Sequence, residues 1–404
     1  MSAPYSLSEN LARIRKTRNL SQEQLAAAAG VAVDTVARIE RGERQTTRPS
    51  TVNKLAAALG VAPAVLLGVH APAHGRDAVG GELRQAITAT YEVPGLTDFP
   101  EPAEVLGLDE LAGTAHRAWR AYVDGRHGEL LHALPSLLID ARRLAHHSTG
   151  DTKAAAHRVL SIAYRLGAGI AGRFGLEDLA WTAAERALHT ARLSDAPDLQ
   201  TAVSLRYLVW TLIRQGRTDE AERIAVRAAE RIEPSMLDHD PNRAGVFGNL
   251  LFNAATAALW GGFGDRANDL LAVAHSVAVR AGRDRANEMS IFGPRVAALQ
   301  AVDQTVRLGD PHTALRMADS IPAATCHIPA FWEAGHQLVL AAAATELRHN
   351  RLALTYLTKA RDLAPDWVRY QPLGVSTMRL LVDRAARRRG KDFAALAAHY
   401  GVVS

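Results

Sequence analysis

The sequence has little cysteine, few aromatic residues and no long apolar run. Its 404 residues include one cysteine, Cys326, and only 5% Phe, Trp and Tyr. A single cysteine excludes a disulfide framework and a zinc site made of several cysteines, as is usual in a reducing compartment. The N-terminal residues, with Glu9, Arg13 and Lys16, lack the apolar core of a signal peptide, and no run could span a bilayer. We therefore expect a cytoplasmic protein with no membrane partner.

Motifs of common catalytic and metal sites are also absent. The sequence has no glycine-rich loop ending in Lys-Ser or Lys-Thr, no HExxH and no GxSxG. Two pairs of potential metal ligands, His146-His147 and Cys326-His327, are adjacent in the chain, and adjacent side chains on a helix point apart. We expect no enzymatic activity, no cofactor and no bound metal.

The charge of the chain is unevenly distributed. Hydrophobic residues make up 48% of the sequence and charged residues 22%, which is enough for two or three domains with large cores. The net charge is +5, and residues 1–70 hold nine Lys and Arg against five Asp and Glu, so most of the excess lies there. Such a local excess is typical of a module that meets nucleic-acid phosphates. The alternative is an ordinary solvated basic surface.

The stretch 21–42, SQEQLAAAAGVAVDTVARIERG, predicts two short helices joined by a tight turn. Ser21 is a favourable N-cap, and Gly30 suits a residue that leaves a helix with positive φ. Val36 and Ile39 give the second helix a buried stripe, and Gly42 ends it. Two helices of this size cannot bury a core alone. The flanking apolar residues that would complete the core are Leu11, Ile14, Val52, Leu55 and Leu59.

Residues 8–68 resemble the Cro/phage-repressor (xenobiotic-response-element, XRE) type of helix-turn-helix. The residues that carry the resemblance are Gln22, Leu25-Ala26, Gly30-Val31, Thr35-Val36, Ile39-Glu40, Gly42, Leu55-Ala56 and Leu59-Gly60-Val61. The resemblance implies a five-helix DNA-binding domain. Where that family usually has Ser or Thr at the N-cap of the recognition helix, this chain has Ala32, a loss that costs the helix about 1 kcal/mol.

The resemblance also implies a set of residues that contact DNA. The recognition helix would run from about Ala32 to Arg41, with Val33, Asp34 and Arg38 facing the base edges. Arg38 would contact guanine, Val33 a thymine methyl group and Asp34 a cytosine amine. The alternative for Asp34 is that it only complements the helix dipole. The residues expected to contact phosphate are Gln22, Thr35, Arg44, Arg48 and Lys54.

A single domain of this size reads only half of a DNA site. Specific binding in this class normally needs a two-fold dimer on a near-palindromic operator. We therefore expect double-stranded DNA and a second copy of this chain (a homodimer) as partners.

Composition divides the chain into three parts. The segment 68–81, GVHAPAHGRDAVGG, has no periodicity and is expected to be a hinge, and a short helix from Glu82 to Tyr91 follows it. We assign residues 1–68 to the DNA-binding domain, 69–102 to a linker and 103–404 to a helical repeat domain.

Glycines mark the repeats in the third part. Five glycines each stand five residues before a small or aliphatic residue, and a second such residue follows seven positions later. This pattern predicts helical hairpins in which the glycine makes the turn and small side chains let two helices pack closely. The sets are Gly125 with Leu130 and Leu137, Gly175 with Ala180 and Ala187, Gly216 with Ala221 and Ala228, Gly262 with Ala267 and Ala274, and Gly309 with Ala314 and Ile321. In a sixth set Ala353 and Ala360 fit, but Arg348 replaces the glycine.

These hairpins are similar to tetratricopeptide (TPR) repeats, although the glycine spacings of 50, 41, 46 and 47 exceed that family's period of about 34. We expect an all-α protein with an N-terminal five-helix Cro/repressor-type domain and a C-terminal TPR-like α-solenoid. The combination resembles the peptide-sensing (RRNPP-like) regulators of Gram-positive bacteria and the TPR-containing regulators of actinobacteria. The resemblance implies a transcription regulator, as in quorum sensing, whose solenoid dimerises and binds a peptide or small-molecule signal. The alternative is a scaffold that binds a protein partner, with constitutive DNA binding and no small ligand.

In the predicted repeat register, the first helix of each pair directs particular residues into the concave groove. Asn side chains can bond the main chain of an extended peptide, and Arg side chains can hold a carboxylate. The candidate ligand-binding residues are Arg165, Arg173, Arg206, Trp210, Arg214, Asn249, Asn253, Asp303 and Gln337, with Trp260 and Arg307 beside them. The alternative is that the tryptophans are core residues and the arginines form a solvated face.

Overall fold

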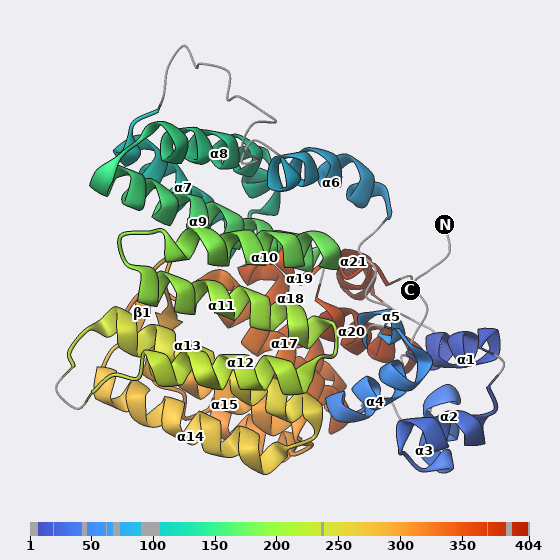
Figure 1. Cartoon of the computed structure of the whole chain (residues 1–404). Coiled ribbons are helices and arrows are strands. Elements are labelled where there is room, and N and C mark those ends of the chain that lie inside the picture. The colour runs from blue at the N-terminus through green and yellow to red at the C-terminus, as the bar shows by residue number, and fades with distance from the viewer. Residues whose placement is uncertain are drawn as a thin grey trace.

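Helices make up nearly all of the regular structure, which confirms the predicted all-α class (Figure 1). The computed structural model describes residues 7–18, 20–42, 47–61, 63–67, 73–89, 106–235, 238–369, 371–384 and 390–402. The helices of the N-terminal domain are α1 (Leu7–Thr17), α2 (Gln22–Ala29), α3 (Val33–Glu40), α4 (Pro49–Leu59) and α5 (Pro63–Leu66).

The N-terminal domain has the caps and the core that the sequence predicts. Ser21 and Gln24 form a capping box at α2, in which Ser21 Oγ accepts from the Gln24 N–H at 3.1 Å. Gly30 ends α2 with a φ of 59°, and Ala32 begins α3 without a side-chain hydrogen bond. Core residues that are at most 1% exposed include Leu11, Leu25, Val36, Ile39 and Leu55.

Helix α6 (Ala73–Thr88) occupies part of the segment assigned to a linker. A helix was expected only from Glu82, so the predicted hinge is corrected to a helix from Ala73 onward. Leu83, Ala86 and Ile87 are buried in the core of the repeat domain. Their i, i+3, i+4 spacing gives α6 one apolar face, and burial of this face outweighs the weak helix propensity of its glycines. Residues 68–72 and 90–105 lie outside the described part of the chain.

Within the described residues, six pairs of antiparallel helices stack into a solenoid. The pairs are α7 (Leu108–Val123) with α8 (His127–His147), α9 (Gly150–Arg173) with α10 (Glu177–Arg192), α11 (Pro197–Arg214) with α12 (Thr218–Arg231), α13 (Pro241–Gly261) with α14 (Gly264–Ala281), α15 (Pro294–Arg307) with α16 (Pro311–Ala318), and α17 (Ala330–Glu346) with α18 (Asn350–Leu363). Three further helices close the C-terminal end, namely α19 (Pro365–Val368), α20 (Pro372–Arg384) and α21 (Lys391–His399).

The turns of these pairs lie where the sequence places them. The five predicted glycines have φ between 70° and 95°, a left-handed conformation that glycine adopts without steric cost. In the sixth turn Arg348 has a φ of 61°, and among the described residues no other non-glycine residue has a positive φ. The first packing residue of each pair is fully buried, as Ala180 and Ala221 illustrate. Ile321, by contrast, lies beyond the end of α16 and makes no second packing position.

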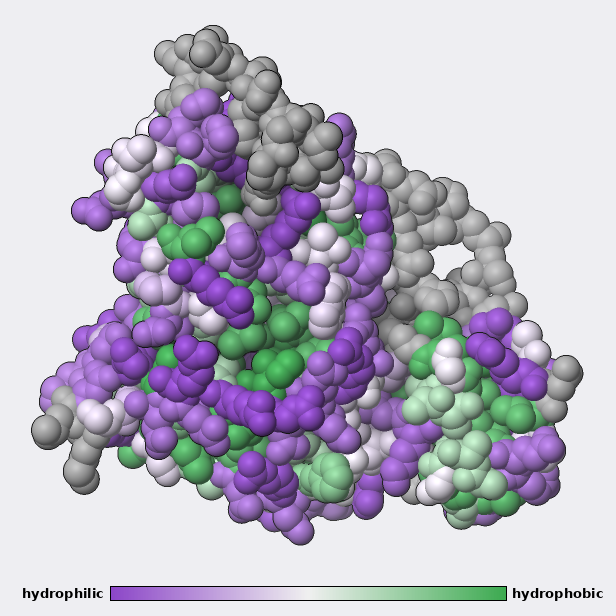
Figure 2. Space-filling view, viewed as in Figure 1, coloured by the Kyte–Doolittle hydropathy of each residue, from purple (hydrophilic) through white to green (hydrophobic). Residues whose placement is uncertain are grey.

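The N-terminal domain rests on the turns of the third and fourth helix pairs. Asn53 Nδ2 on α4 donates to the carbonyl oxygen of Trp260, at the end of α13, at 2.9 Å. Two turn glycines lie under the domain, and a Cβ added to them would lie 3.2 and 3.3 Å from its side chains. These packed pairs are Gly216 with Pro63 and Gly262 with Ser50. Figure 2 shows the domain as a separate lobe beside the solenoid, whose surface mixes purple and green side chains.

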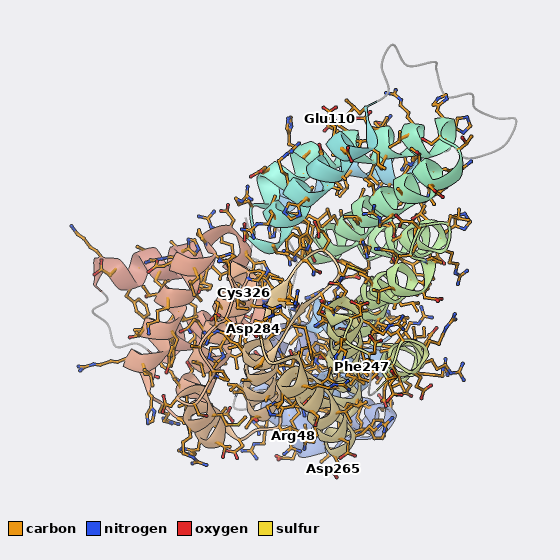
Figure 3. The ribbon with its side chains drawn as sticks, turned by 90° about the vertical axis from the view of Figure 1, so that its left-hand side faces the viewer. Arg48, Glu110, Phe247, Asp265, Asp284 and Cys326 are labelled. Atoms are coloured by element: carbon orange, nitrogen blue, oxygen red, sulfur yellow. The ribbon has the colours of Figure 1, made fainter. Side chains whose placement is uncertain are left out.

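A two-stranded hairpin interrupts the helical pattern between α14 and α15. Strand β1 (Arg285–Ala286) pairs antiparallel with β2 (Ile291–Phe292). These strands were not predicted, because two residues are too few to show a period. The carboxylate of Asp284 accepts from the Arg295 N–H at 3.0 Å and from the Thr325 N–H at 3.2 Å, which fixes the start of the hairpin. Figure 3 shows Asp284 and Cys326 between the green helices of the first pairs and the red helices of the last.

Two negative observations apply to the described ranges. No helix there is both long and apolar enough to cross a membrane. No three His, Cys, Asp or Glu side chains in these ranges gather closely enough to hold a metal ion.

Candidate functional site

The outer face of α3 carries the three residues expected to meet bases. Val33, Asp34 and Arg38 are all exposed, Val33 by 42%. Arg38 Nη1 lies 3.6 Å from Asp34 Oδ2, and both side chains of this i, i+4 pair are more than half exposed. Such a pair contributes about 0.5 kcal/mol or less, so either side chain can exchange it for a base contact. Thr35, on the same helix, is half-buried.

A part-buried ion pair behind this face fixes α3 to α1. Arg15 Nε and Nη2 donate to the carboxylate of Glu40 at 2.6 and 2.9 Å, and Gln22 Nε2 donates to it at 2.7 Å. Burial alone would raise the pKa of Glu40, but the hydrogen bonds from Arg15 and Gln22 hold it below its ordinary value. The side chain of Gln22, predicted to bind phosphate, therefore holds the recognition helix in this structure. Sequence reasoning missed Arg15 and Glu40, because 25 residues separate them.

The other residues expected to contact phosphate belong to the segment after α3. Arg48 and Lys54 are exposed on α4 and at its N-cap, on the domain that carries the recognition helix. Arg44 lies outside the described residues. Ser50 and Asn53 of the same helix contact the solenoid, so α4 has one side for the solenoid and another for solvent.

Three predicted groove residues bind the chain's own main chain. Arg206 Nη1 donates to the carbonyl oxygen of Met289 at 2.9 Å. Asn249 pairs with Ile291 in both directions, with Nδ2 donating to its carbonyl oxygen at 2.9 Å and Oδ1 accepting from its N–H at 3.3 Å. Asn253 Nδ2 donates to the carbonyl oxygen of Arg206 at 3.2 Å. Arg206 and Asn249 therefore bond the internal hairpin in this structure, and Asn253 bonds α11, while their binding of an external ligand stays a prediction.

Arg173 and Arg214 are also held inside the protein. The Arg173 guanidinium lies 4.0 Å from the centre of the Tyr122 ring, and its Nη1 donates to His127 Nε2 at 2.9 Å. Burial and the nearby Arg173 charge lower the pKa of His127 to about 3, so this ring is neutral and can accept the hydrogen bond. Arg214 Nε lies 3.7 Å from the carboxylate of Glu177. Both arginines therefore have internal partners.

The remaining predicted groove residues have varied environments. Trp210 is 41% exposed and does not belong to the core. Arg307 Nε donates to Asp303 at 2.8 Å, and the Asp303 charge raises the pKa of Arg307. Gln337 is half-buried, and its Oε1 has no hydrogen-bond partner among the described residues. Trp260 packs partly against the core, while its carbonyl oxygen bonds the N-terminal domain.

A family model and a relative from Bacillus subtilis each match part of the chain. A family described as helix-turn-helix matches residues 11–66. The HTH-type transcriptional repressor RghR of Bacillus subtilis (strain 168) is 30% identical over 115 residues, which are 28% of this chain and 78% of that protein. The chain belongs to the HTH-type transcriptional regulators.

Other similar proteins cover this regulator to different extents. The HTH-type transcriptional regulator RghRB of Bacillus subtilis (strain 168) is 42% identical over 53 residues, which are 13% of this chain and only 38% of that protein. Among solved structures, PlcR of Bacillus thuringiensis, in complex with the peptide PapR7 and DNA, has a TM-score of 0.37 and 12% identity over 87% of this chain and 98% of that chain. Most of the regulator lies outside the aligned parts of the two Bacillus subtilis relatives, so the properties of its solenoid follow from its own residues.

Arg165 of the regulator differs from the other predicted groove arginines. Its side chain is 2% exposed, and neither Nη atom has a hydrogen-bond partner among the described residues. Burial lowers the pKa of Arg165 to about 10, which leaves it protonated at neutral pH. Arg165 lines a pocket of about 520 Å³. The other polar residues of this pocket, which sequence reasoning missed because they come from separate elements, are His116, Arg158, Asp195, Gln200, Asn242 and Glu288.

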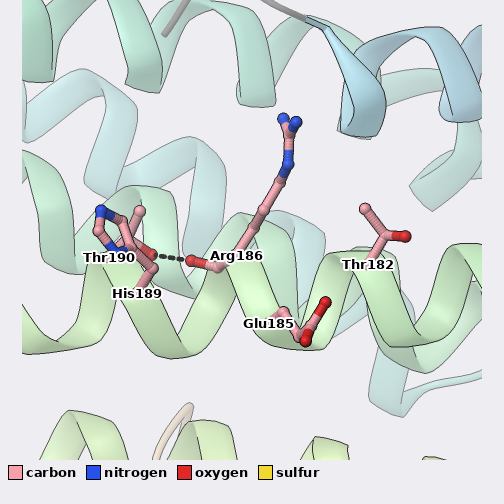
Figure 4. A pocket seen from close by; sticks show the side chains of 5 residues that line it. All are labelled: Thr182, Glu185, Arg186, His189 and Thr190. Carbon is pink, nitrogen blue, oxygen red and sulfur yellow. Dashed lines mark hydrogen bonds between the residues drawn. The ribbon is translucent and has the colours of Figure 1, made fainter. Parts of the chain in front are cut away.

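A second pocket of the regulator, of about 290 Å³, lies against α10 (Figure 4). Arg186 points from this helix toward α6, and its Nη1 donates to the carbonyl oxygen of Ala89 at 3.1 Å. Thr190 Oγ1 donates to the carbonyl oxygen of Arg186 at 2.9 Å, one turn back along the helix. The arginine of this pocket thus anchors the end of α6, which is a structural role.

Proposed function

We propose that the chain is a dimeric transcriptional regulator that reads a near-palindromic operator with α3 and responds to a small signal bound in its solenoid. The observation that carries the proposal is the exposed set Val33, Asp34 and Arg38, on a helix that the part-buried Arg15–Glu40 pair fixes in place. Base reading needs side chains that can reach the groove from a backbone that does not move. Membership of the HTH-type regulators supports DNA as the partner.

Substitutions on α3 and α4 separate base reading from phosphate binding. Arg38→Ala should relax sequence preference at one position per half-site, with about 1–3 kcal/mol less discrimination there. Arg48→Ala should weaken binding to all sequences about equally and reduce the salt dependence by about one counterion. Both are measured by titrating operator variants at several salt concentrations. An unchanged sequence preference in Arg38→Ala would show that α3 reads DNA through other residues.

The dimer is proposed because one recognition helix covers only half a site. Two copies of the N-terminal DNA-binding domain (the head), related by a two-fold axis, would contact half-sites one helical turn apart, about 34–36 Å between centres. Sedimentation of the complex should give two chains per operator, and a single half-site should bind far more weakly. Equal affinity for the half-site and the full operator would contradict this assembly.

The solenoid is proposed as the sensor because it contains a sizeable pocket with a buried arginine, Arg165, whose two Nη atoms have no hydrogen-bond partner among the described residues. The pocket volume of about 520 Å³ lies in the usual range of small-molecule sites. A ligand that binds the folded state raises the melting temperature, so a thermal-shift screen of peptides and small metabolites can find it. A hit that also changes operator affinity supports a sensor. If no compound in the screen raises the melting temperature, the alternative is favoured. In that alternative the solenoid is a scaffold that binds a protein, and DNA binding is constitutive.

The contact between head and solenoid gives such a signal a route to DNA. Asn53 on the head is bonded to Trp260 on α13, the helix that also bonds the hairpin through Asn249. A change in the solenoid around α13 would therefore alter the surface on which the head rests. Asn53→Ala should leave DNA binding of the unliganded protein nearly intact but weaken its response to a hit from the screen. A full response in this variant would place the route elsewhere.

A further inference from the structure

The pocket around Arg165 is built from four helix pairs and the hairpin. Its walls come from α7, α9, the start of α11, the start of α13 and the loop between β1 and β2. Arg165, a predicted groove residue on α9, lines the pocket. The pocket is partly open to solvent, and the loop of the hairpin bounds one side of it.

Ionisable side chains at the rim of the pocket are bonded to one another. Arg158 Nε donates to both oxygens of Asp195, at 2.9 and 3.0 Å. His116 Nδ1 is bonded to the carboxylate of Glu288 on the hairpin. These pairs lie at the rim, with side chains between 25% and 55% exposed. Arg165 lines the same pocket but is more deeply buried, and Tyr207 and Glu288 act on it through their charge rather than through a hydrogen bond to its Nη atoms.

Two buried side chains of the pocket lack hydrogen-bond partners. Arg165 is 2% exposed and has two unbonded Nη atoms among the described residues, and Gln200 is 3% exposed with an unbonded Oε1. Buried polar groups are nearly always satisfied, and a buried charge without a partner is costly. The Arg165 guanidinium offers N–H donors and a positive charge, and Gln200 Oε1 offers a hydrogen-bond acceptor. Together they define a ligand with an anionic acceptor and a separate N–H donor.

The hairpin excludes an extended peptide from the adjacent groove. Asn249 bonds the main chain of Ile291 through both Nδ2 and Oδ1, and Arg206 Nη1 bonds the carbonyl oxygen of Met289. Gly248 on α13 lies so close to the Phe292 ring that an added Cβ would overlap it, so no space remains between hairpin and helix. The chain's own strand therefore occupies the track along α13 that a bound peptide would need. The pocket at Arg165 lies outside this packed track.

We propose that this pocket binds a small carboxylate that also carries an N–H donor, with the carboxylate on Arg165 and the donor on Gln200 Oε1. The fork of the guanidinium matches a carboxylate with two parallel hydrogen bonds. Glu288 and Met289 bring the hairpin to the ligand, so the occupied site stabilises the hairpin in place. The inference rests on the proposed sensing role of the solenoid, and it assigns a small molecule rather than a peptide as the signal.

The test uses the full-length protein, labelled with ¹⁵N-arginine, and two matched probes. N-acetylglycine has a carboxylate and an N–H donor, whereas N-acetylglycinamide lacks the carboxylate. N-acetylglycine should shift the Arg165 resonances, identified by their loss in Arg165→Met, and raise the melting temperature above a sodium chloride control of equal ionic strength. The amide should do neither.

Two variants make the outcome decisive. Arg165→Met replaces an unpaired buried charge by an apolar chain of similar length, so it should fold at least as stably as the wild type and lose the response. Arg266→Met removes an exposed arginine paired with Glu222 and should keep the response. An equal response to the amide, a response that persists in Arg165→Met, or none to N-acetylglycine beyond the salt control would each overturn the proposal.

A parallel measurement separates this inference from the proposed function. If the wild type binds carboxylates through Arg165 but no double-stranded DNA, the pocket stands and the regulator function fails. If it binds operator DNA while a short-peptide library, rather than N-acetylglycine, shifts the hairpin signals of Met289, the regulator stands and the small-molecule assignment is wrong.

Discussion

Arginines on the recognition face and on the concave side of the solenoid have opposite environments. Arg38 is 53% exposed and pairs with Asp34 in contact with water. Arg206 is half-buried and bonds the hairpin, whereas Arg165 is buried and its Nη atoms have no hydrogen-bond partner among the described residues. A solvated charge changes partners at little cost, whereas a buried one is costly until a partner meets it. On α3, the exposure of Arg38 is the observation that favours an outside partner. At Arg165, that observation is the pair of buried Nη atoms without a hydrogen bond among the described residues.

The largest expected effect comes from breaking the part-buried ion pair behind the recognition face. Glu40→Ala leaves Arg15 and Gln22 without the carboxylate to which both donate. Hydrogen bonds to charged groups contribute about 1.5–3 kcal/mol each, so the free energy of unfolding in denaturant should fall by about 3 kcal/mol. The exposed pair supplies the control, since Asp34→Ala should change stability by less than about 0.5 kcal/mol. An equal loss of unfolding free energy in Glu40→Ala and Asp34→Ala would contradict the difference between the part-buried and the exposed ion pair.

A second substitution tests whether the hairpin is packed into the concave side. Gly248→Ala places a Cβ against the Phe292 ring, and such overpacking costs about 1–3 kcal/mol. Gly128→Ala is the matched control, because this helical glycine has nothing within 4 Å of its added Cβ. It should gain about 0.5 kcal/mol from helix propensity. If denaturation gave Gly248→Ala the same small gain, the hairpin would not be seated on α13.

The stability of the solenoid should also depend on pH, because it contains the buried His336. Burial lowers the pKa of His336 on α17 from 6.5 to about 4. Between pH 6.5 and about pH 4, His336 is protonated in the unfolded chain but neutral in the folded chain. The contribution of His336 to stability therefore falls as pH falls through this window and is constant above it. The expected slope is about 1 kcal/mol per pH unit from this group. His336→Gln should remove that slope, and the exposed His312→Gln should retain it.

A third arginine environment, exposed but strained, should give the smallest effect. Arg348 occupies a turn with a φ of 61°, where the other repeat turns have glycine. Arg348→Gly relieves the strain but adds freedom to the unfolded chain, for a net gain of about 0.5 kcal/mol. Gly309→Ala is the reverse change, with no neighbour within 4 Å of the added Cβ, and should cost about 1 kcal/mol. Melting temperatures that moved in the same direction would refute the strain argument.

The features that the sequence predicted depend on local geometry. A Ser21 cap, a glycine turn at Gly30 and the missing cap at Ala32 involve residues within one helical turn, so spacing alone is sufficient. The repeat turns follow in the same way, and even Arg348 could be assigned from the small residues after it.

The features that it did not predict depend on pairs distant in the chain. Asn249 was expected to bond an extended peptide, but its partner Ile291 lies 42 residues away in a strand too short to show a period. Ser290 and Phe292 pack beside it against glycines of α13, which no pattern in either segment indicates. Arg165 was identified by its repeat register, but its missing partner became evident only when the neighbouring pairs were placed.

The head rests on two turns that belong to different helix pairs. Pro63 packs on Gly216, between α11 and α12, while Ser50 and Asn53 contact the turn and end of α13. Neighbouring pairs in a solenoid are related by a small rotation, and that rotation fixes the separation of the two contact points. If the rotation changes, one contact point shifts against the other and the head must tilt. Because α3 lies beyond both points, its tip moves farther than either, so the curvature of the solenoid determines the direction in which the recognition helix points.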